Sequence, residues 1–333
     1  VSMTLGMIIG APVVLTYTLL GGMWSVAVTT FVQMIVIVIG LLLVTNAATD
    51  MAGGLPLVLE RAAAEGKFDW MPSMNMIDIL AWMAAFFTLA LGSIPQQDVF
   101  QRVNTSKNER VAVWATTAGG VAYFFFAFVP LMLAYSASMI DPDMTATLME
   151  NDTQLVLPTF VATHMPFWLQ VIFFGALLSV IMSTASGTLL APSVTFTENV
   201  LKNLIPGMSD TQLLTYTRYT VFGFTLLVVL NAILSDGNIH DMVVNAYRIT
   251  LAGVFIPLTA GLFWRKASNL GATLSIGLGL GTWILVELTI PDIAFEPQFV
   301  GLGFSLLGMI VGSYLAPNPN SANHRGIADP RPV

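Results

Sequence analysis

The chain has 333 residues, of which 56% are hydrophobic and 9% charged, with a net charge of −7. Soluble domains carry about 25% charged residues, so most of this chain does not face water. The acidic balance disfavours a nucleic-acid partner, and the lack of cysteine excludes disulfides and thiolate metal sites. Since Val, Leu, Ile and Phe recur without period-two alternation, the sequence predicts an all-α, polytopic membrane helix bundle.

Nine apolar segments reach or approach the roughly 20 residues needed to cross a bilayer. In chain order they are 4–20, 23–44, 76–94, 113–134, 168–195, 213–234, 241–264, 269–290 and 299–316. Gly21 and Gly22 leave almost no loop between the first two, and the linkers 45–75 and 136–166 are long and acidic. We therefore predict a transmembrane domain over residues 1–316 and a disordered, cytoplasmic polar tail over residues 317–333.

Positive charges sort to one side when the predicted loops are alternated, and the positive-inside rule makes that side cytoplasmic. The cytoplasmic set is Arg102, Lys107, Arg110, Lys202, Arg265, Lys266, Arg325 and Arg331, against only Arg61 and Lys67 outside. The prediction is an integral protein of a bacterial-type cytoplasmic membrane with an external start. Because the chain enters an apolar run at once, from Val1, we expect it to be the C-terminal part of a longer protein.

The segment around Gly175–Asn199 is crowded with small and hydroxyl residues despite its apolar setting. On a helix, Val180, Ser183 and Thr184 fall on one face, at i, i+3 and i+4. Two hydroxyls beside a backbone carbonyl can replace the water shell of a small hard cation. The alternative is that both hydroxyls bond back to their own helix and that the face simply packs well.

Arg248 lies inside an apolar segment, where an ionisable side chain is expensive and marks a candidate site. It is a candidate ligand for an anionic group on a substrate. The alternative is that it snorkels or pairs with a nearby acid, of which Asp236, Asp241 and Glu287 are candidates.

Segment 76–94 carries Trp82, Phe86 and Phe87, of which the first two are i, i+4 neighbours. Such aromatics can stack on a substrate or enclose a cation, although they more often face lipid or pack in a core. Gly92 and Pro95 break the same segment near its end. Gly/Pro-broken spans are typical of transporter binding sites, so both are candidate gating positions.

No phosphate-binding loop, potassium-filter motif or catalytic constellation occurs in the sequence. We therefore expect neither an enzyme nor an ATP-driven pump, and no cofactor. The sequence does not define the oligomeric state.

Four motifs in order resemble the sodium:solute symporter family, whose members include proline, glucose and choline transporters. They are YTLLGGMWSVAVTTFVQ (17–33), LGSIPQQDVFQRV (91–103), GALLSVIMSTASGTLLAPS (175–193) and IPLTAGLFWRK (256–266). The resemblance covers the chain to about Tyr314 and is nearest to the choline branch at the second motif.

The resemblance implies a five-plus-five inverted-repeat fold with alternating access around a midplane site. This chain would supply the end of the first repeat, the whole second repeat and two extra helices, with the N-terminal helices missing. The sodium site common to the family would fall on Val180, Ser183 and Thr184. Sodium is then a co-transported ligand.

Two departures from the family pattern bear on the ion count. Thr30 stands where many members have Asp, and Gly187 lacks the hydroxyl of a second sodium site, which together favour one sodium per cycle. Trp82 matches an aromatic that contacts choline in that branch. A nearby Arg248 would repel a quaternary ammonium, so a carboxylate-bearing solute, such as an amino acid or organic acid, fits better.

The favoured hypothesis is sodium-coupled symport of a small organic solute across the bilayer. The alternatives are a transporter-like sensor or receptor, and an ion channel.

Overall fold

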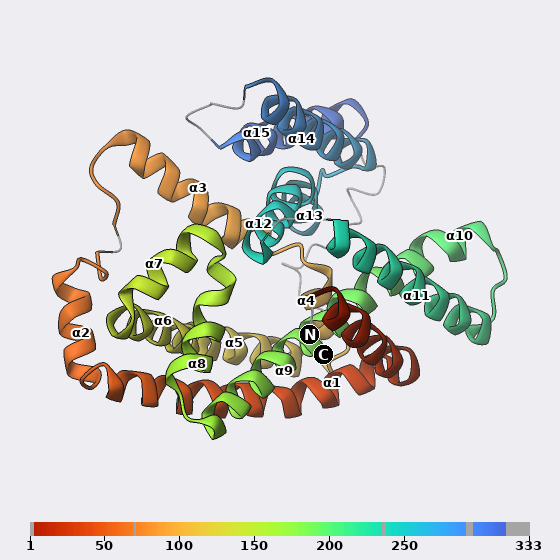
Figure 1. Cartoon of the computed structure of the whole chain (residues 1–333). Coiled ribbons are helices and arrows are strands. Elements are labelled where there is room, and N and C mark those ends of the chain that lie inside the picture. The colour runs from red at the N-terminus through yellow and green to blue at the C-terminus, as the bar shows by residue number, and fades with distance from the viewer. Residues whose placement is uncertain (1–2, 70, 235–237, 291–295, 318–333) are drawn as a thin grey trace. The chain divides into compact units, whose positions relative to one another are not determined.

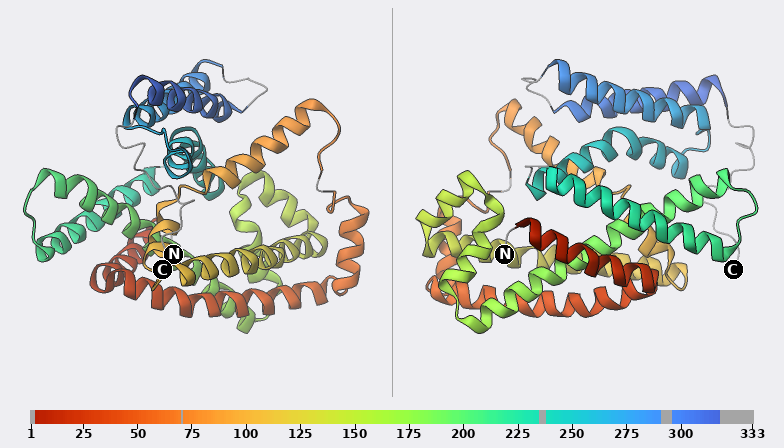
Figure 2. Two further views of the ribbon diagram at one scale, coloured as in Figure 1. Left: turned by 180° about the vertical axis from the view of Figure 1, so that it is seen from behind. Right: turned by 45° about the vertical axis from the view of Figure 1, so that its right-hand side comes forward.

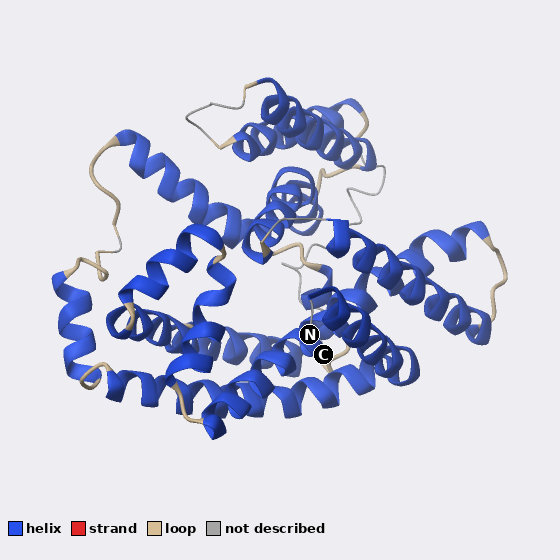
Figure 3. Cartoon of the chain, viewed as in Figure 1, coloured by secondary structure: helices blue, strands red, loops and turns tan. Residues whose placement is uncertain are grey.

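The computed structural model describes residues 3–69, 71–234, 238–290 and 296–317 (Figure 1). Regular structure within these ranges is helical throughout, without a strand (Figure 3). The same ranges contain eight helices that are long and apolar enough to cross a membrane. The predicted all-α fold class is confirmed. Residues 318–333 of the predicted tail lie outside the described ranges.

The helices form two compact units, which we describe separately. Unit 1 comprises residues 1–68 and 97–238, and unit 2 comprises residues 69–96 and 239–333.

Helix α1 (Met3–Met51) opens unit 1 and contains the first two predicted segments. Gly22 interrupts it with φ 52° and ψ −147°, a conformation that glycine adopts without steric cost. In the right-hand view of Figure 2 the dark red start of the helix folds back above its later part. The break predicted at Gly21 and Gly22 is therefore present, and the two segments count as one of the eight helices.

The predicted linker 136–166 is largely helical, which corrects the sequence analysis. It contains the end of α6 (Phe128–Ile140), then α7 (Pro142–Asn151), a 3₁₀ turn η1 (Thr153–Leu155) and α8 (Val156–His164). Two of its acids are helix caps: the Asp141 carboxylate accepts the Met144 N–H, and the Asp152 carboxylate accepts the Gln154 N–H. Phe160 and Val161 are fully buried in the core, so the linker folds as part of the bundle.

The remaining helices of unit 1 are α2 (Leu55–Ala64), α4 (Gln97–Asn104), α5 (Glu109–Phe126), α9 (Phe167–Phe196) and α11 (Asp210–Leu234). Among them, α9 and α11 follow predicted segments, α5 covers part of the predicted segment 113–134, α2 lies in the predicted linker 45–75, and α4 lies between two predicted segments. Helix α9 continues through Pro192 into a π-helical turn, η2 (Thr197–Leu201), and the short α10 (Lys202–Leu204). It packs along α1, and Val44, Leu133, Phe160 and Leu169 form the larger core.

Unit 2 is built from α3 (Met76–Gly92), α12 (Ile239–Thr250), α13 (Ile256–Phe263), α14 (Asn269–Thr289) and α15 (Pro297–Leu315). A π-helical turn, η3 (Leu251–Phe255), joins α12 to α13. Small residues form the seam between α14 and α15: Gly271, Ser275 and Gly279 are buried on α14, and the hydroxyls of Ser275 and Ser305 lie 2.8 Å apart. Small residues at four-residue spacing allow this close helix approach.

The packing at this seam predicts that replacing two glycines of α14 by alanine has opposite effects on the stability of the protein. A Cβ at Gly279 would collide with the Ala252 carbonyl and lie 2.8 Å from the Ser305 Cβ, whereas Gly277 has nothing within 4 Å. Gly279→Ala should cost about 1–3 kcal/mol of stability through overpacking. Gly277→Ala should be neutral or gain up to about 1 kcal/mol of helix propensity. Thermal unfolding in one detergent measures both, and equal effects would contradict the described packing.

Candidate functional site

The hydroxyl groups of α9 divide into two sets. Five downstream hydroxyls, four on α9 and that of Thr197 on the following turn η2, donate to carbonyls of the preceding turn. These are Ser186 to Ser183 (3.0 Å), Thr188 to Thr184 (2.8 Å), Ser193 to Leu189 (2.6 Å), Thr195 to Ala191 (3.0 Å) and Thr197 to Ser193 (2.8 Å). Such bonds satisfy a hydroxyl within its own helix. The Thr197 hydroxyl also lies 3.3 Å from Thr220 Oγ1 on α11.

Ser183 and Thr184 belong to the other set. The Ser183 hydroxyl donates to Thr30 Oγ1 on α1, at 3.2 Å, and Ser183 is half-buried. Thr184 is exposed, and within the described residues its hydroxyl donates to no backbone carbonyl. The alternative in which both hydroxyls bond back to their own helix is therefore not what the structure shows.

Val180 completes the face predicted from the i, i+3, i+4 spacing, with its side chain 39% exposed. Its neighbours on the same turn are fixed from α1, because the Tyr17 hydroxyl donates to the Met182 carbonyl at 2.6 Å. Two side chains of α1, Tyr17 and Thr30, thus hold this turn of α9. The three predicted residues lie together on one turn that is anchored to a second helix.

Arg102 approaches the same helix from α4, which sequence reasoning missed. Its guanidinium lies against Gly187, where a Cβ would collide with Nη2. Gly187 is one turn, about 6 Å along the axis, beyond Ser183. The position that lacks the hydroxyl of a second ion site therefore has a positive charge beside it. The only signal in the sequence was a basic residue on a short polar helix after a broken span.

The aromatic group on α3 has the predicted arrangement in unit 2. Trp82 and Phe86 stack with ring centroids 5.5 Å apart and planes 5° from parallel, and Phe87 meets Phe86 edge-on at 5.5 Å. Trp82 is 37% exposed and Phe86 53% exposed. The pair presents an accessible aromatic face within its unit.

Arg248 on α12 has two polar partners in the structure. Nη1 donates to Asn245 Oδ1 at 3.2 Å, and Nη2 lies 3.3 Å from the Glu296 carboxylate just before α15. Glu296 was not among the acids considered from the sequence, and Asp236 lies outside the described residues. An ion-pair partner for Arg248 is thus present inside the chain.

Gln298 holds that ion pair in place. It is only 2% exposed, and its Nε2 donates to Glu296 Oε2 at 3.1 Å and to Thr88 Oγ1 of α3 at 3.0 Å. A buried amide with two such partners fixes its neighbour's orientation. The network links Arg248 to the helix that carries the aromatic face.

Gly92 and Pro95 lie where one helix ends and the next has not begun. Helix α3 ends at Gly92 and α4 begins at Gln97. Gly92 is needed for close approach to α12, because a Cβ there would lie 2.5 Å from the Tyr247 carbonyl oxygen. The Thr250 hydroxyl donates to the Gly92 carbonyl at 2.6 Å, which satisfies a group freed by the end of the helix.

In the part of the chain that the structure describes, no group of three or more His, Asp or Glu side chains is placed to hold a metal ion. The hydroxyl and carbonyl oxygens of α9 are of the kind that hard monovalent cations prefer.

The eight long apolar helices among the described residues are those of an integral membrane protein. The model of the sodium:solute symporter family matches residues 1–279, and the chain belongs to that family. Its named relatives are transporters rather than enzymes.

The human high affinity choline transporter 1 is 26% identical over 296 residues, covering 84% of this chain and 49% of that protein. The high-affinity proline transporter of Bacillus subtilis is 25% identical and is covered to 66%, with 95% of this chain matched. The sodium/pantothenate symporter of Escherichia coli is 25% identical, with 92% of this chain and 64% of that protein covered. The chain thus spans about half the length of the choline transporters it matches.

A solved structure of a sodium-coupled sialic acid symporter has the same fold. It aligns with a TM-score of 0.76 at 17% identity, over 95% of this chain and 68% of that chain.

The contact at Gly92 can be tested with two threonines of the same span. Thr250→Val removes the bond to the Gly92 carbonyl together with longer contacts to carbonyls of its own helix, whereas Thr259→Val removes only a bond to Phe255 of its own helix. Interhelical bonds in membranes average about 0.6 kcal/mol and reach about 1.7 kcal/mol. Thermal unfolding should show a loss of this size for Thr250→Val beyond that for Thr259→Val. A larger loss for Thr259→Val would contradict the assignment.

Proposed function

We propose that the complete protein carries out sodium-coupled secondary active symport of a small organic solute across a bacterial-type cytoplasmic membrane. The observation that carries the proposal is the turn of α9 at Val180, Ser183 and Thr184. Among the described residues, the hydroxyls of Ser183 and Thr184 donate to no carbonyl of their own helix, while five hydroxyls further along do.

Sodium binds in this proposal to the Val180 carbonyl and to the hydroxyls of Ser183 and Thr184. The Ser183 hydroxyl already faces Thr30 on α1, so it lies at a contact between two helices. An ion held there stabilises the arrangement in which those helices are close. A high external sodium concentration therefore shifts the protein toward the conformation that binds the ion more tightly. The solute then closes the external gate, and both are released when the repeats rock.

One sodium ion per cycle is the proposed stoichiometry. Thr30 supplies a neutral oxygen where many family members have a carboxylate, and Gly187 supplies none. The guanidinium of Arg102 against Gly187 adds a fixed positive charge at the position of the missing ligand. A second cation beside it would be repelled.

The solute is proposed to bind at the exposed aromatic face of Trp82 and Phe86, with Phe87 beside them and Arg248 as the charged contact. A carboxylate on the solute must displace Glu296 from the Arg248 guanidinium, since Nη2 is engaged by that acid. Gly92 and Pro95 are proposed as the gating break between α3 and α4. Gly92 lies against Tyr247 of α12, and its carbonyl accepts the Thr250 hydroxyl of the same helix.

The sodium assignment predicts specific losses in uptake by the full-length protein in vesicles. Ser183→Ala and Thr184→Ala should each raise the sodium concentration for half-maximal uptake about tenfold, which is about 1.4 kcal/mol for one lost ligand. Thr195→Ala is the control, because its hydroxyl bonds to Ala191 of its own helix.

If the double variant retained the sodium dependence of the wild type, the site would be wrong although symport would stand. Uptake that fails to concentrate any solute against its gradient would instead indicate a channel.

The role of Arg248 is tested by changing both members of its ion pair. If Arg248 binds a solute carboxylate, Arg248→Gln weakens anionic solutes selectively. Glu296→Gln removes the competitor and should strengthen their binding by up to about fivefold, for an ion pair worth up to about 1 kcal/mol. Half-saturation constants for matched anionic and neutral solutes measure this. Equal losses for both solutes in both variants would make the pair purely structural.

A further inference from the structure

A cavity of about 460 Å³ lies between α13 and α15 of unit 2, away from the residues assigned above. This size falls within the usual range of ligand pockets, about 300–1,000 Å³. The nine lining residues are Ile256, Thr259, Ala260, Phe263, Trp264, Leu306, Met309, Ile310 and Tyr314. None of these nine is charged, and the Thr259 hydroxyl bonds to the Phe255 carbonyl of its own helix at 2.7 Å. The interior therefore suits a hydrocarbon chain.

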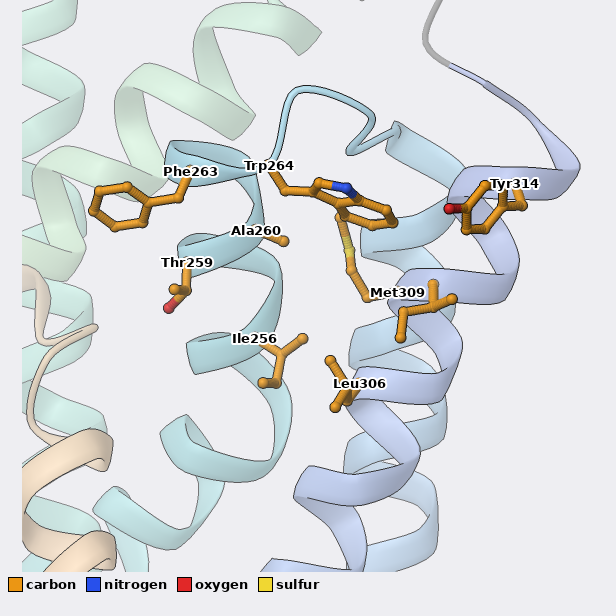
Figure 4. A pocket seen from close by; sticks show the side chains of 9 residues that line it. Ile256, Thr259, Ala260, Phe263, Trp264, Leu306, Met309 and Tyr314 are labelled. Atoms are coloured by element: carbon orange, nitrogen blue, oxygen red, sulfur yellow. The ribbon is translucent and has the colours of Figure 1, made fainter. Parts of the chain in front are cut away.

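The cavity has an apolar end and an aromatic end. Figure 4 shows Ile256 and Leu306 at one end and Trp264 with Tyr314 at the other. The two aromatic rings meet at 6.2 Å and 63°. Ile256 and Trp264 are eight residues apart, so the cavity follows α13 for about 12 Å. Trp and Tyr favour the membrane–water interface, which places the mouth at headgroup level and the far end in hydrocarbon.

Positive charge lies beside the aromatic mouth. Arg265 and Lys266 follow Trp264 directly and are both exposed. Lys266 Nζ lies 5.6 Å from the centroid of the Tyr314 ring, so its charge is held over the rim of the cavity. The positive-inside prediction assigns this end to the cytoplasmic leaflet, where anionic lipids concentrate.

We propose that this cavity binds one anionic phospholipid, with an acyl chain between α13 and α15 and the headgroup phosphate at Arg265 and Lys266. A zwitterionic lipid would also fill the cavity, but its headgroup carries no net negative charge to neutralise Arg265 and Lys266. A second copy of the chain would have to bury both cations, which is costly without matching acids. The proposal concerns lipid binding and holds independently of the transported solute.

Native mass spectrometry of the full-length protein from mixed micelles tests the proposal. The micelles contain phosphatidylglycerol and phosphatidylcholine with identical acyl chains. The wild type should retain one phosphatidylglycerol in preference to phosphatidylcholine. Arg265→Gln with Lys266→Gln should reduce that preference about tenfold or more, since each cation near anionic lipid contributes severalfold in affinity.

Two further variants separate the headgroup from the cavity. Lys107→Gln with Arg110→Gln removes two exposed cations from the same predicted side and should leave the preference unchanged. Ala260→Phe fills the cavity and should abolish retention of both lipids. Equal loss in the two charge variants, no preference in the wild type, or unchanged retention in Ala260→Phe would each overturn the proposal, as would a lipid-free dimer.

Discussion

Hydrogen-bond satisfaction without water is the constraint on which this bundle depends. A hydroxyl at membrane depth has few partners, so most of those on α9 bond to the preceding turn of their own helix. Ser183 instead meets Thr30 across the contact with α1. The same residue types therefore have two roles on one helix, and geometry rather than composition separates them.

Close packing of small residues positions both candidate sites. In unit 1, Gly187 leaves space for the Arg102 guanidinium beside the hydroxyl turn. In unit 2, Gly92 lets the α12 backbone approach the end of α3, and the glycines of α14 and α15 bring those helices together. Where the backbones approach so closely, a single methyl group decides whether the polar groups nearby can meet. Glycine, which has no side chain to block a neighbour, therefore shapes both candidate sites as much as the polar residues do.

Much of the fold followed from local patterns in the sequence. Hydropathy located the spans, Gly21 and Gly22 marked the first break, and Gly92 marked another. The region 136–166 was misjudged because its acids read as a solvated linker, whereas Asp141 and Asp152 cap helices whose apolar residues are buried. Contacts between distant residues had no local signal: Arg248 and Glu296 are 48 positions apart, and Arg102 reaches Gly187 from another helix. Side-chain chemistry suggested the candidates, and only the fold supplied their partners.

The turn at Gly22 has a consequence for the whole chain. The apolar stretch Leu5–Met51 has 47 residues, which as one straight rod would measure about 70 Å, more than twice a hydrocarbon core of about 30 Å. The reversal at φ 52° divides this length into two shorter helical segments, each of which the sequence predicts to cross the membrane once. In the predicted topology, loss of the reversal would change the number of membrane crossings by one and move every later loop to the opposite side. Which side of the membrane each later loop faces in that topology therefore depends on Gly22, whose side chain is a single hydrogen atom.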